Sequence, residues 1–114
     1  MNTDSKRVLL YKTNKGSQPY ADWFKKLKDV KTKAIILKRI ERLILGNLGD
    51  CKALKEGIHE LRIDYGPGFR VYFAQEGEDI ILLIAGGDKS TQTQDIEKAK
   101  EYYHDHTARL NSQL

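Results

Sequence analysis

Hydrophobic and polar residues alternate along this chain with the periods of strands and helices. A short apolar run at Arg7–Tyr11, followed by a turn-prone Thr-Asn-Lys-Gly segment, predicts a first strand. Pro19 then opens a predicted helix over about residues 20–27. The predicted buried face of that helix consists of Trp23, Phe24 and Leu27.

A longer helix is predicted from Val30 to about Leu45, with Asp29 as its N-cap. At about 100° per residue, apolar and basic side chains fall on separate arcs of this helix. The apolar arc comprises Ile36, Leu37, Ile40, Leu43 and Ile44, and the basic arc comprises Lys31, Lys38, Arg39 and Arg42. Ile35 falls inside the basic arc, where it would be partly exposed or would contact a partner.

In the second half of the chain the period changes to two. Residues 58–65 and 69–74 form a predicted hairpin joined by a tight Gly-Pro-Gly connection. A continuous apolar run at 79–85 predicts a strand that is covered on both faces. A capping box at Thr91–Gln94 opens a last helix, and the polar tail after about His106 is expected to fray. The apolar stripe of that helix consists of Ile96, Ala99, Tyr102 and Tyr103.

These elements follow the order β-α-α-β-β-β-α. The expected fold class is α+β, a compact domain with an antiparallel sheet and helices packed on one face. At 114 residues the chain is one domain long, spanning 1–114 with about 107–114 as the frayed tail.

Charge is unevenly distributed along the chain. The formal charge is +8 over residues 1–46, −1 over 47–76 and −3 over 77–114, which gives the net +4. This polarity predicts a surface that binds a polyanion, and a solvated lysine-rich helix face is the alternative.

Little in the sequence suggests metal or redox chemistry. The single cysteine, Cys51, cannot form an internal disulfide, and His104, Asp105 and His106 lack a further ligand at a known spacing. We therefore expect no cofactor and no metal. The apolar run near the start is too short for a signal peptide or a membrane span, so a cytoplasmic protein without a membrane partner is expected.

The hairpin supplies the first candidate site. Its apolar side chains must face the core, so Arg62, Arg70 and Tyr72 share the opposite, open face. Guanidinium groups bind phosphate bidentately and a phenol ring can stack on a base. With the turn centred on Pro67, Arg62 lies opposite Tyr72 and Asp64 lies opposite Arg70, so an ordinary surface ion pair of the last two is the alternative.

Basic residues outside the hairpin extend this candidate site. Lys89 precedes the last helix, whose N-terminus favours an anion, and Gly86 and Gly87 either admit a close backbone or only shape the turn. Lys52 and Lys55 add positive charge near the same face, or only keep a loop soluble.

Two segments carry a family resemblance. Residues 60–73 (ELRIDYGPGFRVYF) and 86–92 (GGDKSTQ), with Asp95-Ile96, closely resemble the HigB-like, phage-derived addiction-module killer branch of the RelE/ParE toxin superfamily. The likeness extends from Tyr11 to about Tyr103. It implies the compact RelE-like fold and, in many members, a ribosome-dependent mRNA endonuclease neutralised by a cognate helix-turn-helix antitoxin.

The resemblance also implies roles for single residues. In the ribonuclease members a basic, metal-free site directs a 2′-hydroxyl onto the adjacent phosphate, giving a 2′,3′-cyclic phosphate and a 5′-hydroxyl. Arg62 and Arg70 match the motif arginines, and Lys89 matches the lysine of the Gly-Gly-Asp-Lys element. Lys55 or Lys52 could act as the general base if neighbouring cations lower its pKa. The expected RNA contacts are Lys52, Tyr72, Lys31, Lys38 and Arg42.

The resemblance leaves other functions open. Some members carry a catalytic tyrosine or an Asp-Tyr-His cluster near the last strand, where this chain has Asp88-Lys89-Ser90, so the general acid is unassigned. ParE-like members inhibit DNA gyrase without cutting RNA, and an inactive nucleic-acid-binding prophage module is a further alternative. The basic helix would contact ribosomal RNA or an acidic antitoxin segment.

Overall fold

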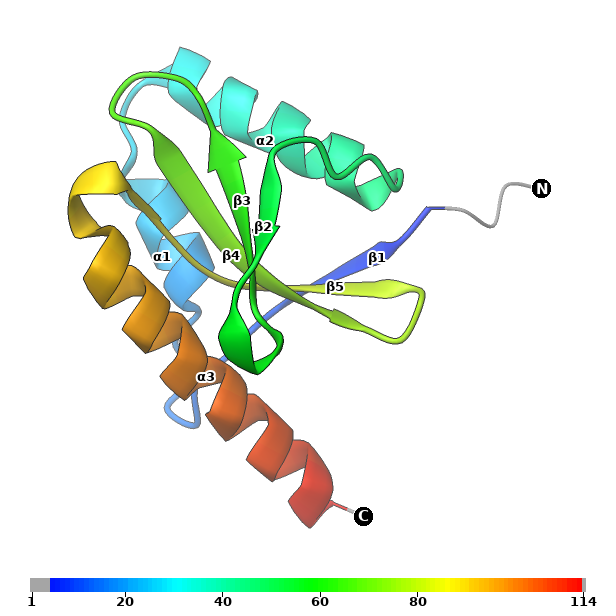
Figure 1. Cartoon of the computed structure of the whole chain (residues 1–114). Helices are drawn as coiled ribbons and strands as arrows, with labels where there is room; N and C mark the ends of the chain where they lie inside the picture. Colours follow the sequence, from blue (N-terminus) through cyan, green and yellow to red (C-terminus); the bar gives the residue numbers. More distant parts are fainter. Residues whose placement is uncertain (1–4, 114) are drawn as a thin grey trace.

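The computed structural model describes residues 5–113 and confirms the α+β class (Figure 1). The ends of the expected domain, residues 1–4 and 114, lie outside the described part. The strands are β1 (Arg7–Leu10), β2 (Cys51–Ala53), β3 (His59–Ile63), β4 (Phe69–Glu76) and β5 (Ile80–Asp88). The helices are α1 (Pro19–Lys26), α2 (Val30–Ile44) and α3 (Gln92–Ser112), with single 3-10 turns η1 (Lys55–Gly57) and η2 (Lys89–Thr91).

The five strands form one mixed sheet in the order β1-β5-β4-β3-β2. β1 runs parallel to β5, with Arg7 paired to Ile80, whereas the other neighbours are antiparallel. The expectation of a purely antiparallel sheet was therefore wrong for this one pair. Side-chain period identifies a strand but does not give its direction or its neighbour. The three-residue edge strand β2 was also missed, because it is too short to show a period.

Helices cover both faces of the sheet, not the single face that was expected. α1 and α2 pack on one face over the core cluster that holds Ile36, Leu61 and Val71. α3 lies across the other face, where Ala99 packs with Tyr72 and Ile84 (Figure 1). β5 carries apolar side chains on both faces, so each face needs a helical layer to exclude water from it.

The second helix matches its expected bounds, and Asp29 caps it as predicted. The Asp29 carboxylate accepts hydrogen bonds from the backbone N–H of Thr32 at 3.2 Å and from its hydroxyl at 2.6 Å. Leu37 was wrongly assigned to the buried arc, because it is 52% exposed. The helix docks along Ile36, Ile40 and Leu43, which leaves Leu37 on the outer flank.

The last helix begins and ends differently from the prediction. The Thr91 side chain makes no capping bond to the backbone and instead donates to the Asp95 carboxylate at 2.5 Å. The expected frayed tail is helical to Ser112. Arg109 explains the added length, because its guanidinium donates to Asp105 at 2.7 Å and to the carbonyl of Lys12 at 2.5 Å. Among the described residues, no helix has the length and apolar character needed to cross a membrane.

Tyr20 carries a polar atom that the core does not satisfy. Its side chain is 6% exposed, and its hydroxyl has no hydrogen-bond partner among residues 5–113. Burial raises the pKa of this phenol to about 12. Tyr20→Phe should therefore increase the free energy of unfolding by about 1 kcal/mol at neutral pH.

The same substitution should also make the free energy of unfolding depend less on pH in the alkaline range. The unfolded phenol ionises near pH 10 and the folded one near 12, so wild-type stability is complete below pH 10 and falls as the pH rises toward 12. Urea unfolding at pH 8 and pH 11 checks both effects. A variant less stable than wild type at pH 8 would show that the hydroxyl has a partner.

Candidate functional site

The hairpin pairs in a register different from the predicted one. Arg62 lies opposite Arg70, and Glu60 lies opposite Tyr72. The turn is centred on Gly66, not Pro67, because five residues connect β3 to β4 and both Gly66 and Gly68 adopt positive φ. The register differs from the prediction by two residues, so each side chain keeps its face.

Three of the predicted cations converge at one end of the sheet. Arg62 pairs with Arg70 across β3 and β4, and Arg70 pairs in turn with Gly87 of β5. A Cβ placed on Gly68 would lie 3.5 Å from Nη1 of Arg70 and 3.6 Å from Cβ of Lys89. Arg70 and Lys89 are therefore neighbours. We call Arg62, Arg70 and Lys89 the basic cluster.

A buried glutamate lies beneath the basic cluster. Glu60 is 0% exposed, and its carboxylate accepts hydrogen bonds from Nε of Arg62 at 3.0 Å, from Nε2 of Gln92 at 2.7 Å and from the Tyr72 hydroxyl at 3.2 Å. Nε of Arg70 lies 3.9 Å from the same carboxylate. The alternative surface ion pair of Asp64 with Arg70 does not form within the described residues.

The hydrogen bonds keep Glu60 ionised in spite of its burial. Burial alone raises the pKa of this carboxyl, but the bonds from Gln92, Arg62 and Tyr72 outweigh burial and leave the pKa below its ordinary value. Tyr72 responds in the opposite direction, since burial and the nearby Glu60 charge raise the pKa of its phenol. The site thus has a fixed internal anion that offsets part of its positive charge.

Acid stability should depend on this carboxylate. Because its folded pKa is depressed, Glu60 contributes stability that is present above its ordinary pKa of 4.5 and is lost as the pH falls further. Glu60→Gln should therefore reduce the slope of unfolding free energy against pH by up to about 1.4 kcal/mol per unit below pH 4.5. Urea unfolding between pH 3 and 7 measures this slope. A Glu60→Gln protein with the wild-type slope would contradict the prediction.

Two further predicted residues lie on the same sheet face, in different settings. Lys52 of β2 pairs with Glu60 and is exposed, so it extends the basic cluster toward the sheet edge. Tyr72 is 0% exposed, so the prediction that it offers its ring to a base was wrong. Its ring packs under α3, and its hydroxyl supports Glu60 instead.

Lys55 lies apart from the basic cluster. It belongs to η1, where the neighbouring Glu56 contacts Lys100 at 3.5 Å and His104 at 2.8 Å. Those two residues are roughly two to three turns along α3 from Gln92. The structure therefore brings Lys52, and not Lys55, toward Glu60.

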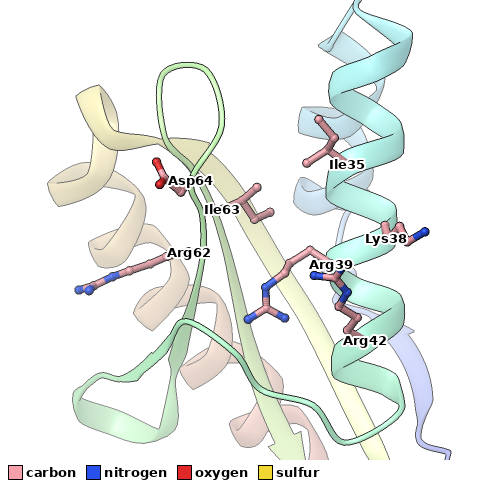
Figure 2. Close-up of a pocket in the computed structure, with 7 residues that line it drawn as sticks. All are labelled: Ile35, Lys38, Arg39, Arg42, Arg62, Ile63 and Asp64. Carbon is pink, nitrogen blue, oxygen red and sulfur yellow. The ribbon is translucent and has the colours of Figure 1, made fainter.

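Three predicted RNA contacts lie on α2, over the opposite face of the sheet. Lys31 is exposed, and its ammonium lies 5.9 Å from the centre of the Tyr65 ring. Lys38 and Arg42 line a groove of about 290 Å³ between α2 and the hairpin (Figure 2). The remaining lining residues are Ile35, Arg39, Arg62, Ile63 and Asp64.

Arg39 and Arg62 border this groove in different ways. Figure 2 shows Arg39 extending from α2 toward the hairpin, whereas the side chains of Arg62 and Asp64 point away from α2. Arg39 donates a hydrogen bond to the carbonyl of Leu48, and burial lowers the pKa of its guanidinium. The α2 groove and the basic cluster therefore lie on opposite faces of the sheet and meet at Arg62, which belongs to both.

Sequence reasoning missed Glu60 and Gln92 as parts of the site. The strand period did place Glu60 on the same face as Arg62, but that face was taken to be open to solvent. The apolar run of β5 was the signal that the face had to be covered. Gln92 ends the GGDKSTQ segment that carries the family resemblance, but its contact with Glu60 depends on where α3 packs, which the segment alone does not give.

The histidines do not form a metal centre in the described chain. His104 pairs with Glu56 at 2.8 Å, and His106 pairs with Glu76 at 2.5 Å. Within residues 5–113 no group of three or more histidine, cysteine or acidic side chains is arranged to hold a metal ion.

Fold and site together define a small α+β protein whose sheet carries an arginine–lysine cluster over a buried glutamate. No protein-family model matches the chain. A Haemophilus influenzae protein described as uncharacterized is 49% identical over 81 residues, which cover 71% of this chain and 82% of that protein. The chain belongs to the same family as this Haemophilus protein.

Proposed function

We propose that this protein is the toxin of a type II toxin–antitoxin system, a metal-independent endonuclease that cuts mRNA on the ribosome. The observation that carries the proposal is the basic cluster. Arg62, Arg70 and Lys89 come from three different segments and meet at one end of the sheet. The likeness of residues 60–73 and 86–92 to the RelE/ParE superfamily gives this cluster its proposed substrate.

The proposed reaction needs concentrated positive charge. The RNA 2′-oxygen forms a bond to phosphorus and loses its proton to a base, while the bond to the 5′-oxygen breaks and that oxygen gains a proton. The products are a 2′,3′-cyclic phosphate and a 5′-hydroxyl. Extra negative charge gathers on the phosphate oxygens in the transition state, and preorganised cations stabilise it. Arg62, Arg70 and Lys89 are the groups in position to do so.

The geometry favours Lys52 over Lys55 as the proposed base. Lys52 pairs across β2 and β3 with Glu60, directly beneath the basic cluster. Lys55 lies beside the middle of α3, next to the contacts of Glu56. Among the described residues no side chain is as well placed to act as the general acid as Lys52 is to act as the base. Solvent water is the simplest proton donor to the 5′-oxygen.

The proposed partners follow from these two surfaces, which lie on opposite faces of the sheet and meet at Arg62. The basic cluster would bind mRNA in the ribosomal decoding site in the cytoplasm. Lys31, Lys38 and Arg42 on α2 lie on the other side of the sheet, so they are free to contact ribosomal RNA or an acidic segment of a helix-turn-helix antitoxin.

Inducible expression in a bacterium tests the proposal. Growth is followed while mRNA 5′ ends are mapped within minutes of induction. We expect rapid arrest with new cleavages inside translated codons. Arrest with intact mRNA and double-strand DNA breaks would replace the nuclease with a gyrase inhibitor. Soluble protein that causes no arrest would leave a nucleic-acid-binding module and would contradict the toxin proposal.

A further inference from the structure

Glu60 faces the inner nitrogen, Nε, of both arginines of the basic cluster, but accepts a hydrogen bond only from Arg62. Arg62 donates to Glu60 through Nε, the inner nitrogen of its guanidinium, at 3.0 Å. Nε of Arg70 lies 3.9 Å from the same carboxylate and makes no hydrogen bond within residues 5–113, whereas Nη1 of Arg70 donates to the carbonyls of Gly68 and Phe69 at 3.3 Å. Within residues 5–113 the terminal nitrogens of Arg62 have no hydrogen-bond partner.

Glu60 also connects the arginines to the segment that carries Lys89. Its second oxygen accepts from Nε2 of Gln92 at 2.7 Å, and Gln92 is the first residue of α3, directly after the η2 turn of Lys89–Thr91. The Tyr72 hydroxyl donates to the same oxygen at 3.2 Å. One carboxylate therefore contacts β3, β4 and the start of α3.

Glu60 itself cannot contact a substrate. Its side chain is 0% exposed, whereas the Arg62 side chain is 33% exposed and that of Arg70 is 13% exposed. A buried carboxylate close to two arginines is costly for a surface that only needs positive charge, because it weakens the attraction for phosphate. Its benefit is geometric, since a guanidinium held by its inner edge presents its outer edge in a fixed direction.

We propose that Glu60 is the positioning residue of the basic cluster: it holds the inner edge of Arg62 by a hydrogen bond, attracts Nε of Arg70 across 3.9 Å, and fixes both arginines relative to Lys89 through its hydrogen bond from Gln92. The phosphate then meets the outer amino groups in a fixed arrangement. This inference rests on the proposed function for its substrate, an RNA phosphodiester. In this role Glu60 weakens ground-state binding and strengthens binding of the transition state.

The test compares wild type with Glu60→Gln in ribosome-dependent cleavage of a defined mRNA. The variant keeps the side-chain volume and removes the charge. We expect kcat to fall roughly ten-fold or more, because the guanidinium groups lose their fixed direction. KM should fall roughly two- to five-fold, because one compensating negative charge is gone. A residue that only stabilises the fold would lower kcat by reducing the active fraction and would leave KM unchanged.

A binding measurement separates this inference from the proposed function. The probe is a short RNA made uncleavable by 2′-deoxynucleotides, and its affinity for the protein alone is measured at several salt concentrations. In Glu60→Gln the slope of log affinity against log salt should become steeper by about one, because a freed guanidinium makes a fuller phosphate contact. The matched control is Glu76→Gln, whose carboxylate contacts His106 at 2.5 Å on another part of α3.

Nuclear magnetic resonance detects the hydrogen bond between Arg62 and Glu60 directly. A hydrogen bond to Glu60 should protect the Nε proton of Arg62 from exchange with water, so its signal should be visible in wild type and exchange-broadened in Glu60→Gln, whose neutral amide oxygen is a weaker acceptor than a carboxylate. Loss of the same signal in Arg62→Lys assigns it. If Glu60→Gln does not fold, Gln92→Leu takes its place, with a smaller change in kcat and in the Arg62 signal expected.

The outcomes are distinct. Wild-type protein that cuts no RNA would overturn the proposed function, and the salt slope and the Arg62 signal would still decide the role of Glu60. A folded Glu60→Gln protein with the wild-type KM, salt slope and Arg62 signal would overturn the positioning role, whatever its kcat. Changes of equal size in Glu76→Gln would overturn it too, because they would show a general effect of charge.

Discussion

Arg70→Ala should abolish toxicity while leaving the protein folded. The guanidinium is the most enclosed cation of the basic cluster, with a side chain 13% exposed and Nε 3.9 Å from Glu60. Removing one preorganised donor from such a site costs about 10²- to 10³-fold in rate. Growth after induction and the rate of mRNA cleavage measure the loss, and circular dichroism verifies the fold.

Two further variants make the Arg70 result specific. Arg70→Lys should recover only part of the activity, because an ammonium is a point charge without the planar pair of donors that grips a phosphate. Lys98→Ala removes a cation from α3 whose side chain is 62% exposed, and it should remain fully toxic. A folded Arg70→Ala protein with wild-type toxicity would exclude Arg70 from the site.

Gly86→Ala should destabilise the protein by about 2–3 kcal/mol, the largest effect that we expect from a single added methyl group. Gly86 lies in β5, and a Cβ at this position would overlap the Trp23 ring of α1. Trp23 is itself fixed by aromatic contacts with Tyr20 at 5.9 Å and with Phe69 at 6.3 Å between ring centroids. Urea unfolding followed by circular dichroism measures the loss.

A double-mutant cycle identifies the cause of that loss. In a Trp23→Ala background the ring is gone, so adding Gly86→Ala should cost much less than it costs in wild type. If the cost is the same in both backgrounds, the strain comes from the β5 backbone and not from contact with α1. Neither role predicted for Gly86 is correct, because Gly86 lies within β5 and admits the Trp23 side chain, not a neighbouring backbone or a turn.

Local pattern predicted most of the elements, because each depends on nearby residues. Asp29 capped its helix as expected, and the hairpin placed Arg62, Arg70 and Tyr72 on one face. The partner strands and covering layers depend on distant residues instead. The parallel pairing of β1 with β5 and the position of α3 belong to this second group.

In the candidate site, too, features that depend on nearby residues were predicted and features that depend on distant residues were not. Arg62 and Arg70 were recognisable from their alternation in one hairpin, and Lys89 from its motif. Glu60 has the same periodicity as Arg62, yet its role depends on α3 covering that face, which the predicted one-sided packing excluded. Tyr72 was misassigned for the same reason, since a ring beneath a helix cannot stack on a base.

The parallel pairing of β1 with β5 bears on when the protein can fold during its own synthesis. Arg7 is synthesised long before its partner Ile80 and the α3 residue Gln92. A nascent chain that already contains Arg62 and Arg70 therefore lacks the strand that completes the sheet and the helix that covers Glu60. Under the proposed function, the ribosome making this protein would be exposed to a completed site only after β5 and the start of α3 have been translated.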